Sequence, residues 1–480
     1  MQSSLLASGL ALTPNAIRAY AEVAPSSVAV NLMIDPSRTS YRILPNFMGL
    51  SYEQVELMNP NFFSSANQPL IGFIRKLGRQ GVLRIGGNSS EFLSWAGSSN
   101  QKTIPASGSA SSHSHRFAAI TPESVDNLKQ FLEHTGWSLI YGLNFGHGTP
   151  EQAAEQAAYV MQKIGRDRLI AFQVGNEPDA YHQNGIRKPS YTYEQYTQEW
   201  KRFFVAIRRL VPNAPFAGPD TAYNTQWVLQ FAEEFKDDLQ FASSHYYAEG
   251  PPSNPGMNIA RLLHGTSRGL SDEIAAIADV KAKTGLAFRL TETNSCYGGG
   301  KWGVSNTFAS ALWAVDLMYA QAETGCTGMN FHDVTYKPYS PIVGSLEAGF
   351  LARPEYYGLL LFSLVGPGQL VATQLSGAET IPLLKTYALR GADGRMRVVL
   401  INKDTQTDAQ IKLTGIKASK GRLIRLEAPS VDDANDVTLG GSPIGQSGEW
   451  SALVEETLSL RNGTFQLRIP KGTAAFAEFS

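Results

Sequence analysis

Short apolar runs alternate with longer amphipathic runs from about residue 46 to residue 365. The apolar runs are typical of buried β-strands, and we predict eight of them, at 46–52, 81–87, 137–144, 169–176, 215–220, 240–247, 286–292 and 327–332. The intervening runs have helical periodicity, and two of them begin with Thr-Pro-Glu and end on Gly, as capped helices do. Strands that alternate with helices form a parallel sheet. At this length we predict a closed α/β barrel, a (β/α)₈ TIM barrel, over an open sheet.

A change of pattern after about residue 366 indicates a second domain. Short alternating strands follow one another there, separated by Gly, Asn, Asp and Ser turns, which is typical of an antiparallel β-sandwich. An early strand at 27–35 has no helix beside it, so we expect it to join that sandwich. The predicted organisation is therefore an N-terminal strand segment at 27–45, a barrel at 46–365 and a β-sandwich domain at 366–480.

The charge balance limits the class of partner. The 480 residues contain 41 Lys and Arg against 42 Asp and Glu. Nucleic-acid-binding proteins carry a basic surplus, so we expect no nucleic acid and favour a small substrate. No run of 18 apolar residues is present, so we expect no membrane span. The sequence does not indicate an oligomeric state.

The N-terminal segment 1–26 has a short apolar run and an Ala-Tyr-Ala that resembles a cleavage site, but no basic region before it. It is either the remnant of an export signal or an unstructured terminus, and we expect an exported, periplasmic or extracellular protein. Cys296 and Cys326 are too few for a disulfide framework and are expected to be free. His113 and His115 lie in a serine-rich stretch without a third ligand, so we predict a solvated loop and no metal site.

Polar residues follow almost every predicted strand. The active site of a (β/α)₈ barrel forms at the C-terminal ends of its strands. One polar residue at such a place often only caps the next helix, but a full ring of them predicts one polar cavity. The residues are Tyr52, Glu53, Arg84, Asn88, Asn144, Asn176, Glu177, Asp220, His245, Tyr246, Glu292 and His332.

Two glutamates in this ring, Glu177 and Glu292, end strands that we expect to face each other across the cavity. Glycoside hydrolysis requires such a pair, with one carboxyl protonated and the other ionised. Arg84, together with Tyr246 or His245, is expected to hold Glu292 anionic. Glu177 follows a more apolar strand, which favours its protonated form.

Four segments carry a resemblance to a known family. The stretches "QVGNEPD", "TETNSCYGGG", "LRIGGNSSEF" and "SSHYY" resemble glycoside hydrolase family 79, which contains β-glucuronidases and heparanases. The family belongs to a clan of retaining (β/α)₈ glycosidases, and the likeness covers both predicted domains. Within the family the sequence is most similar to a bacterial β-glucuronidase.

The resemblance implies a role for several residues. Glu177 would be the acid/base, Glu292 the nucleophile, and Asn176 the partner of the sugar 2-hydroxyl. Consecutive glycine amides form a nest for an anion, which fits a bound uronic carboxylate. The resemblance also points to Tyr297, Gly298 and Gly299 for the carboxylate and to Glu53 and Asn88 for sugar hydroxyls. Tyr339 and Lys301 are added as carboxylate partners on proximity alone. The strand-end residues Tyr246, His245 and Arg84 complete the predicted substrate-binding set. No metal or organic cofactor is implied.

The expected function is therefore that of an exo-acting, retaining β-glucuronidase on glucuronic-acid-containing glycosides or oligosaccharides. Retention requires the two carboxyl groups to lie roughly 5–5.5 Å apart. Three alternatives stay open. The specificity could be for glucose or another uncharged sugar, with the glycine loop serving only a structural role. An endo-acting enzyme, heparanase-like or hyaluronan-cleaving, would need an open cleft, and basic flanks for sulfated chains, which are not evident in the sequence. A non-catalytic sugar-binding protein would leave both glutamates unexplained.

Overall fold

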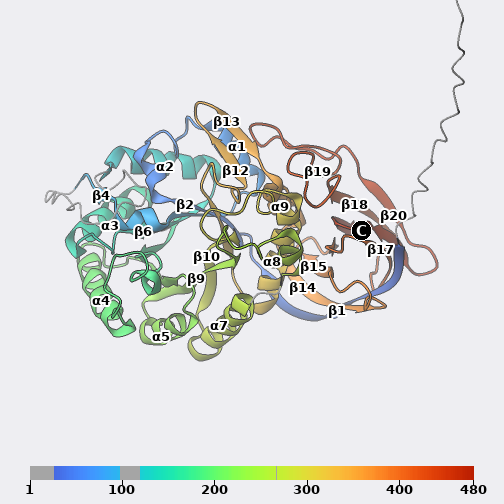
Figure 1. Ribbon diagram of the computed structural model, residues 1–480, viewed down its shortest axis with the longest axis horizontal. Coiled ribbons are helices and arrows are strands. Elements are labelled where there is room, and N and C mark those ends of the chain that lie inside the picture. Colours follow the sequence, from blue (N-terminus) through green and yellow to red (C-terminus); the bar gives the residue numbers. More distant parts are fainter. Residues whose placement is uncertain (1–25, 98–118, 266–267) are drawn as a thin grey trace, which may run out of the picture.

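The computed structural model describes residues 26–97, 119–265 and 268–480 (Figure 1). A barrel and a large β-sheet domain lie side by side along the long axis of the molecule. The predicted export segment and the stretch with His113 and His115 lie outside the described residues. Within the described residues, no helix is both long and apolar enough to cross a membrane.

The eight predicted barrel strands are all present, and they close into a barrel. Neighbouring strands pair in parallel, and the last of them, β11, pairs with β2 to complete the ring, so the predicted fold is confirmed. The strands are β2 (Met48–Glu53), β3 (Val82–Gly86), β6 (Ser138–Leu143), β7 (Leu169–Val174), β8 (Phe216–Thr221), β9 (Leu239–Glu249), β10 (Ala287–Cys296) and β11 (Met329–Asp333).

Helices surround the barrel. The Thr-Pro starts cap their helices as expected, because the side chains of Thr121 and Thr149 accept the N–H groups of Ser124 and Gln152. The helices are α1 (Gln68–Lys76), α2 (Pro122–Thr135), α3 (Pro150–Ile164), α4 (Tyr193–Leu210), α5 (Thr225–Phe235), α6 (Ile259–His264), α7 (Arg268–Thr284), α8 (Phe308–Thr324) and α9 (Pro354–Val365).

The second domain is one ten-stranded sheet that encloses its own apolar core. Its strands run in the order β19-β18-β22-β16-β15-β14-β1-β17-β21, and β20 pairs with β18. They are β1 (Ser26–Ile43), β14 (Gly368–Ser376), β15 (Leu384–Gly391), β16 (Met396–Asn402), β17 (Thr407–Thr414), β18 (Lys420–Glu427), β19 (Thr438–Leu439), β20 (Glu456–Ser459), β21 (Phe465–Ile469) and β22 (Thr473–Phe479).

The N-terminal strand β1 lies inside this sheet, as predicted, and appears in Figure 1 as a blue strand among orange and red ones. It pairs antiparallel with β14 and parallel with β17. The domain is therefore not purely antiparallel, because β1 enters from the other end of the chain and its direction is not set by a hairpin.

The two domains pack through α8 and α9. Both helices are buried around most of their surface, because one side packs on the barrel and the other on the sheet (Figure 1). An ion pair crosses the same junction: the ammonium of Lys403 binds the carboxylate of Asp316 on α8. The hydroxyl of Tyr387 donates to the second oxygen of that carboxylate, at 2.7 Å.

Several short elements were not predicted. A hairpin of β12 (Ile342–Ser345) and β13 (Gly349–Ala352) follows β11, and a short pair of β4 (Ser94–Trp95) and β5 (Ala119–Ile120) follows β3. Single 3₁₀ turns, η1 (Gln54–Met58), η2 (Asn88–Glu91) and η3 (Pro178–Ala180), follow β2, β3 and β7. They stand on the C-terminal face of the barrel, where they shape the loops around the polar strand ends.

Candidate active site

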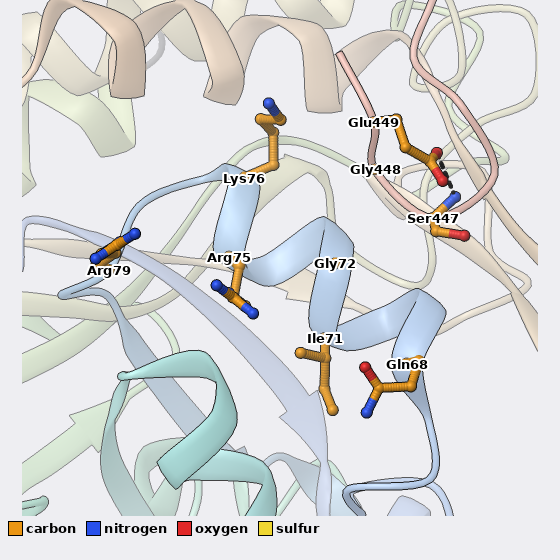
Figure 2. Close-up of a pocket in the computed structure, with 9 residues that line it drawn as sticks. All are labelled: Gln68, Ile71, Gly72, Arg75, Lys76, Arg79, Ser447, Gly448 and Glu449. Atoms are coloured by element: carbon orange, nitrogen blue, oxygen red, sulfur yellow. Dashed lines mark hydrogen bonds between the residues drawn. The ribbon is translucent and has the colours of Figure 1, made fainter.

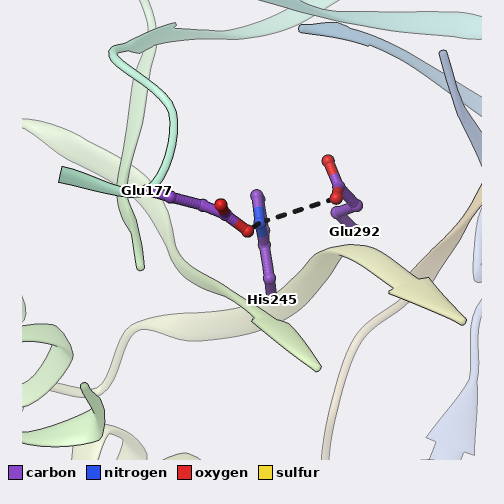
Figure 3. Close-up of side chains that lie close together, drawn as sticks. All are labelled: Glu177, His245 and Glu292. Carbon is purple, nitrogen blue, oxygen red and sulfur yellow. Dashed lines mark hydrogen bonds and ion pairs between the residues drawn. The ribbon is translucent and has the colours of Figure 1, made fainter. Parts of the chain in front are cut away.

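Glu177 and Glu292 face each other across the C-terminal end of the barrel, with the ring of His245 between them (Figure 3). One carboxylate oxygen of each glutamate and one ring nitrogen of His245 all lie within 4.8 Å of one another. Glu177 follows β7, and Glu292 belongs to β10. The structure therefore brings the two predicted carboxylates together.

Glu292 is surrounded by groups that stabilise its anion. The guanidinium of Arg84 lies 2.6 Å from one carboxylate oxygen, and the hydroxyl of Tyr247 donates to the other at 2.6 Å. Burial alone would raise the pKa of Glu292, but the positive charges of His332, His245 and Arg84 outweigh it. Together with the bond from Tyr247 they lower the pKa of Glu292 to about 2. Glu292 is ionised at neutral pH, as a nucleophile must be.

The predicted contact of Tyr246 with Glu292 is wrong by one residue. Successive side chains of a strand point to opposite faces, so His245 and Tyr247 share the face that meets the glutamates. Tyr246 lies on the other face and joins the apolar core. The motif was located correctly, but the parity of the strand decides which tyrosine serves the site.

The pKa of Glu177 is shifted in the opposite direction, upward. Burial raises its pKa, and this effect exceeds the stabilisation that its anion receives from His245, whose Nδ1 lies 2.9 Å from Oε1. Its backbone has φ 54°, a left-handed conformation that few residues other than glycine adopt. Its N–H donates to the carbonyl of Asp220, which has φ 64°. Such conformations persist where the surrounding structure enforces them, often at functional sites.

Arg84 and His245 place two positive charges next to the two glutamates. The wholly buried guanidinium of Arg84 donates to Asn176 Oδ1 and to Asp220 Oδ2, both at 2.7 Å. Burial lowers the pKa of His245, but the charges of Asp220 and Glu292 raise it well above the usual value. The imidazole is therefore held as a cation whose two ring nitrogens face carboxylates.

The spacing of Glu177, His245 and Glu292 would also suit a metal ion. Both nitrogens of His245 are engaged, however, Nδ1 with Glu177 at 2.9 Å and Nε2 with Asp220 at 3.1 Å. A metal ion would have to displace one of these contacts, and the ring nitrogen that binds it would have to release its proton. The donor set fits a hydrogen-bonded acid/base pair better than a cation site.

Glu53, Asn88 and Asn176, the residues expected to contact sugar hydroxyls, lie near one another. The side-chain amide of Asn176 donates to Asn88 Oδ1 at 3.3 Å. Glu53 accepts the N–H of Ser89 at 2.8 Å, and its other oxygen lies 3.6 Å from His332 Nε2. Asn88 is exposed at the mouth of the site, whereas Asn176 is buried at its base.

The glycine loop after β10 has the expected backbone shape. Gly298 and Gly299 have φ values of 77° and 102°, so both require glycine. The N–H of Tyr297 is already bonded to the carbonyl of Glu249 at 3.1 Å, which leaves the two glycines as the better anion donors. Tyr339 is buried, with its ring centroid 6.3 Å from that of Tyr247.

Lys301 does not serve the role that the sequence predicted. Its ammonium donates to the carbonyls of Asn254 and Met257, at 2.9 and 2.8 Å, and so fastens that loop. The cation beside the glycines is Lys337, whose aliphatic chain packs on Gly299: a Cβ added to that glycine would lie 2.8 Å from Lys337 Cδ. No motif singled out Lys337, because it follows the last barrel strand in an irregular loop.

Glu91 is a further residue that the sequence did not reveal as functional, although it lies in the "LRIGGNSSEF" motif. Its buried carboxylate accepts backbone N–H groups from Asn176, from Gly146 and, at 3.2 Å, from Phe145. It therefore ties together the C-terminal ends of β6 and β7, directly before Glu177.

Two cavities lie elsewhere on the molecule. One of 510 Å³ lies between α1 and the turn around Gly448, where the barrel meets the sheet domain (Figure 2). It combines Arg75 and Arg79 with Glu449, so its lining is not uniformly basic. The other, of 590 Å³, lies along α4 and α5. Neither contains the paired glutamates, so the chemistry of the strand ends, and not cavity volume, identifies the site.

Comparison with protein families agrees with both domains. The model of the N-terminal domain of glycosyl hydrolase family 79 matches residues 51–318, and the model of its C-terminal β domain matches residues 386–476. The first of these alone covers more than half of the chain.

Similar proteins are found among fungi. A β-glucuronidase of Neurospora crassa is 26% identical over 435 residues, which cover 80% of this chain and 76% of that protein. One of Aspergillus niger is 24% identical over 425 residues, covering 78% and 75%. We expected the similarity to be to a bacterial β-glucuronidase, whereas these two relatives are fungal.

A solved structure shows the same fold. The crystal structure of a 4-O-α-L-rhamnosyl-β-D-glucuronidase from Fusarium oxysporum matches with a TM-score of 0.73 and 16% identity. The match covers 94% of this chain and 100% of that one. The barrel and the sheet domain built from both chain ends are thus shared as one architecture.

Proposed function

The chain belongs to glycosyl hydrolase family 79 and is a glycoside hydrolase, and from this premise we propose that it is an exo-acting, retaining β-glucuronidase. Its substrates are glycosides and oligosaccharides that end in β-linked glucuronic acid. The observation that carries the proposal is the pair Glu177 and Glu292, which lie close together with pKa values shifted in opposite directions.

The separation of the two carboxylates supports a retaining mechanism. Carboxyl groups of retaining glycosidases lie roughly 5–5.5 Å apart, whereas inverting enzymes leave room for a water molecule at roughly 6.5–9.5 Å. The carboxylate oxygens of Glu177 and Glu292 that face His245 lie within 4.8 Å of each other. This distance fits direct attack by a carboxylate on the anomeric carbon.

In the first step, Glu292 attacks the anomeric carbon while protonated Glu177 gives its proton to the departing oxygen. A covalent glucuronyl-enzyme forms and the leaving group diffuses away. In the second step, Glu177, now ionised, removes a proton from water, which attacks the same carbon and frees Glu292. Two inversions at one carbon leave the β configuration unchanged.

The residues between the glutamates support the charge changes of both steps. Arg84 and Tyr247 hold Glu292 in place as an anion before the attack. His245 contacts Glu177 and stays cationic, so it stabilises Glu177 when that residue has lost its proton. Preorganised groups of this kind lower the barrier because they need no rearrangement during the reaction.

Recognition of glucuronate rests on the glycine loop. The backbone N–H groups of Gly298 and Gly299 offer an uncharged anion site, and the ammonium of Lys337 adds a charge nearby. Glu53 at the end of β2 and Asn88 after β3 supply acceptors for sugar hydroxyls. The two β-glucuronidases of fungi support the same substrate class.

A comparison of substrates tests the proposal. The wild-type protein should hydrolyse 4-nitrophenyl β-glucuronide at least about 100-fold better than the matching β-glucoside, measured as kcat/KM, because only the uronate carboxylate binds the glycine N–H groups and Lys337. Glu292→Gln should abolish turnover, and proton NMR of the first product should show the β-anomer.

The same assay addresses the alternatives. A preference for the glucoside would refute the role of the glycine loop while leaving the retaining pair intact. Rapid loss of viscosity of a hyaluronan or heparan solution before free glucuronate appears would favour the endo-acting enzyme. Binding of glucuronides without any turnover would favour the sugar-binding protein.

A further inference from the structure

The aspartate of the "QVGNEPD" motif has no role in the reaction described above. Asp179 is buried in η3, two residues after Glu177. Its carboxylate accepts three backbone N–H groups of the loop between β8 and α5, from Ala222 at 2.8 Å, Tyr223 at 3.1 Å and Asn224 at 2.9 Å. Asp179 therefore locks this loop to the turn that carries the acid/base.

The locked loop presents an exposed aromatic ring. Tyr223 is 57% exposed, which is unusual for a large side chain whose two ends are both fixed. Its N–H binds Asp179, and its hydroxyl accepts the side-chain amide of Gln183 at 2.8 Å. The hydroxyl also lies 3.4 Å from the carbonyl of Asp179. The ring thus has little conformational freedom to lose when a ligand covers it.

The position of Tyr223 indicates which part of a substrate it meets. The acid/base donates its proton to the leaving oxygen, so groups beyond Glu177, on the side away from Glu292, contact the leaving group. The backbone of Glu177 is bonded to Asp220, three residues before Tyr223. The hydroxyl of Tyr223 contacts the carbonyl of Asp179, two residues after the acid/base. Burial first, then the charge of Asp179, raise the pKa of Tyr223.

Two other exposed aromatic rings, those of Trp302 and Tyr336, are less available. The guanidinium of Arg353 lies 4.9 Å from the ring centroid of Trp302, and the ammonium of Lys337 lies 5.4 Å from that of Tyr336. In the described part of the chain, no cation and no second aromatic ring packs on the ring of Tyr223. An open aromatic face held rigid is suited to stacking on a flat ring.

We propose that Tyr223, fixed by Asp179, is the platform on which the first ring of the leaving group stacks. This assignment rests on the proposed function, in which Glu177 protonates the leaving oxygen. The group that stacks on Tyr223 has a flat face and is attached to the glycosidic oxygen. It is either a second sugar or an aryl group. Substrates with such a group are bound at two points, the glucuronate through the site around Glu292 and the leaving group through Tyr223.

The test compares substrates that share glucuronate but differ in the leaving group. Tyr223→Ala should lower kcat/KM about tenfold for 4-nitrophenyl β-glucuronide and for a glucuronate-terminated disaccharide, the range expected for one lost aromatic contact. It should leave β-glucuronyl fluoride unchanged, because fluoride is too small to reach the ring. Tyr223→Trp should restore most of the loss, and Tyr41→Ala, at an exposed tyrosine of β1, is the matched control.

Asp179→Asn supplies a second variant, because an amide cannot accept all three N–H groups. It should show the same selectivity between ring-bearing substrates and the fluoride. A loss on 4-nitrophenyl β-glucuronide, whose good leaving group needs little proton transfer, supports the platform. A loss confined to the disaccharide would mean weakened protonation by Glu177 and would overturn it. Equal losses on the fluoride and the ring-bearing substrates, or no loss on either, would overturn it.

The proposed function and the platform fail in different ways. A wild-type protein that prefers glucosides contradicts the uronate site alone. The platform is then tested with 4-nitrophenyl β-glucoside against β-glucosyl fluoride, with the same expected selectivity. Loss of that selectivity contradicts the platform, whichever sugar the protein prefers.

Discussion

Glu177 and Glu292 are identical side chains at neighbouring places, yet their surroundings give them different protonation states. Both are removed from water, which raises the pKa of a carboxyl group. Glu292 also faces the guanidinium of Arg84 and the hydroxyl of Tyr247, whereas the strong partner of Glu177 among the described residues is His245 alone. The difference in charged partners therefore separates an acid from a nucleophile.

Removing one hydroxyl should shift this balance measurably. Tyr247→Phe deletes the 2.6 Å hydrogen bond to Glu292, so the ionised form of Glu292 loses stabilisation and its pKa rises. A hydrogen bond to a charged group contributes about 1.5–3 kcal/mol, which corresponds to about one to two pKa units. The acidic limb of kcat/KM should therefore move to higher pH, and its maximum should fall about 10- to 100-fold.

The neighbouring tyrosine is the control for this measurement. Tyr246→Phe changes the same type of side chain on the other face of β9, so it should leave the pH profile of kcat/KM where it is. An equal shift in both variants would mean that the strand, and not the hydrogen bond, sets the pKa of Glu292. Sequence reasoning placed this motif correctly but not the choice between the two tyrosines, since the strand's parity depends on its register with β8 and β10.

At the scale of elements, the site depends on how strand ends are joined. The barrel brings β6 and β7 side by side, but the exact path of the chain after each strand is set by Glu91. Backbone groups there cannot pair within the sheet, and a buried N–H without a partner is costly. A single carboxylate that accepts several of them fixes the left-handed turn at Glu177.

Glu91→Gln should loosen that turn. The amide retains one acceptor oxygen, while its NH₂ group would face a backbone N–H and repel it. We expect a loss of about 1–3 kcal/mol in the free energy of unfolding. We also expect kcat/KM to fall more for glucuronides with poor leaving groups than for those with good ones, because poor leaving groups need the proton of Glu177.

Steady-state kinetics over a series of substituted phenyl glucuronides would measure this effect, with Glu194→Gln on the exposed start of α4 as the control. A uniform loss over the whole series would mean that Glu91 supports the fold alone. A steeper dependence on the pKa of the leaving group would identify it as a positioning residue for Glu177.

The regular elements followed from the sequence because local signals agree with the fold. Each barrel strand is a short buried run, and the Thr-Pro caps fix the starts of α2 and α3. The hairpin of β12 and β13 has no such local signal, and α6, although capped by Asn258 and Gly265, spans only six residues. The role of Lys301 was also missed, since its ammonium is drawn to carbonyls of Asn254 and Met257 that only the folded loop brings near.

At the scale of the whole molecule, buried carboxyl groups should make stability depend on pH. Burial raises the pKa of four of them to about 7, namely Glu56, Glu91, Glu273 and Asp333. The folded state therefore binds more protons than the unfolded state between about pH 4.5 and pH 7. Stability contributed by these groups is present at the lower pH and is lost as the pH rises through 7.

Thermal unfolding at pH 5 and pH 8 would measure this, and the Tm should be lower at pH 8. Glu273→Gln should reduce the difference, because the amide mimics the protonated carboxyl and can still accept the hydroxyl of Ser244. A Tm that stays constant or rises between pH 5 and pH 8 would contradict the assignment. The lowered pKa values of Glu292 and Asp220 act at more acidic pH and do not interfere.

The place of β1 in the sheet domain has a consequence for how the protein is made. β1 leaves the ribosome first, yet its partners β14 and β17 begin at Gly368 and Thr407. At about 5–20 residues per second, roughly 20–70 s pass before the first partner is synthesised. The nascent chain must carry an unpaired strand with apolar side chains such as Leu32 and Ile34 throughout that interval. The barrel can fold on the ribosome, whereas the sheet domain is completed only after the last strand has been translated.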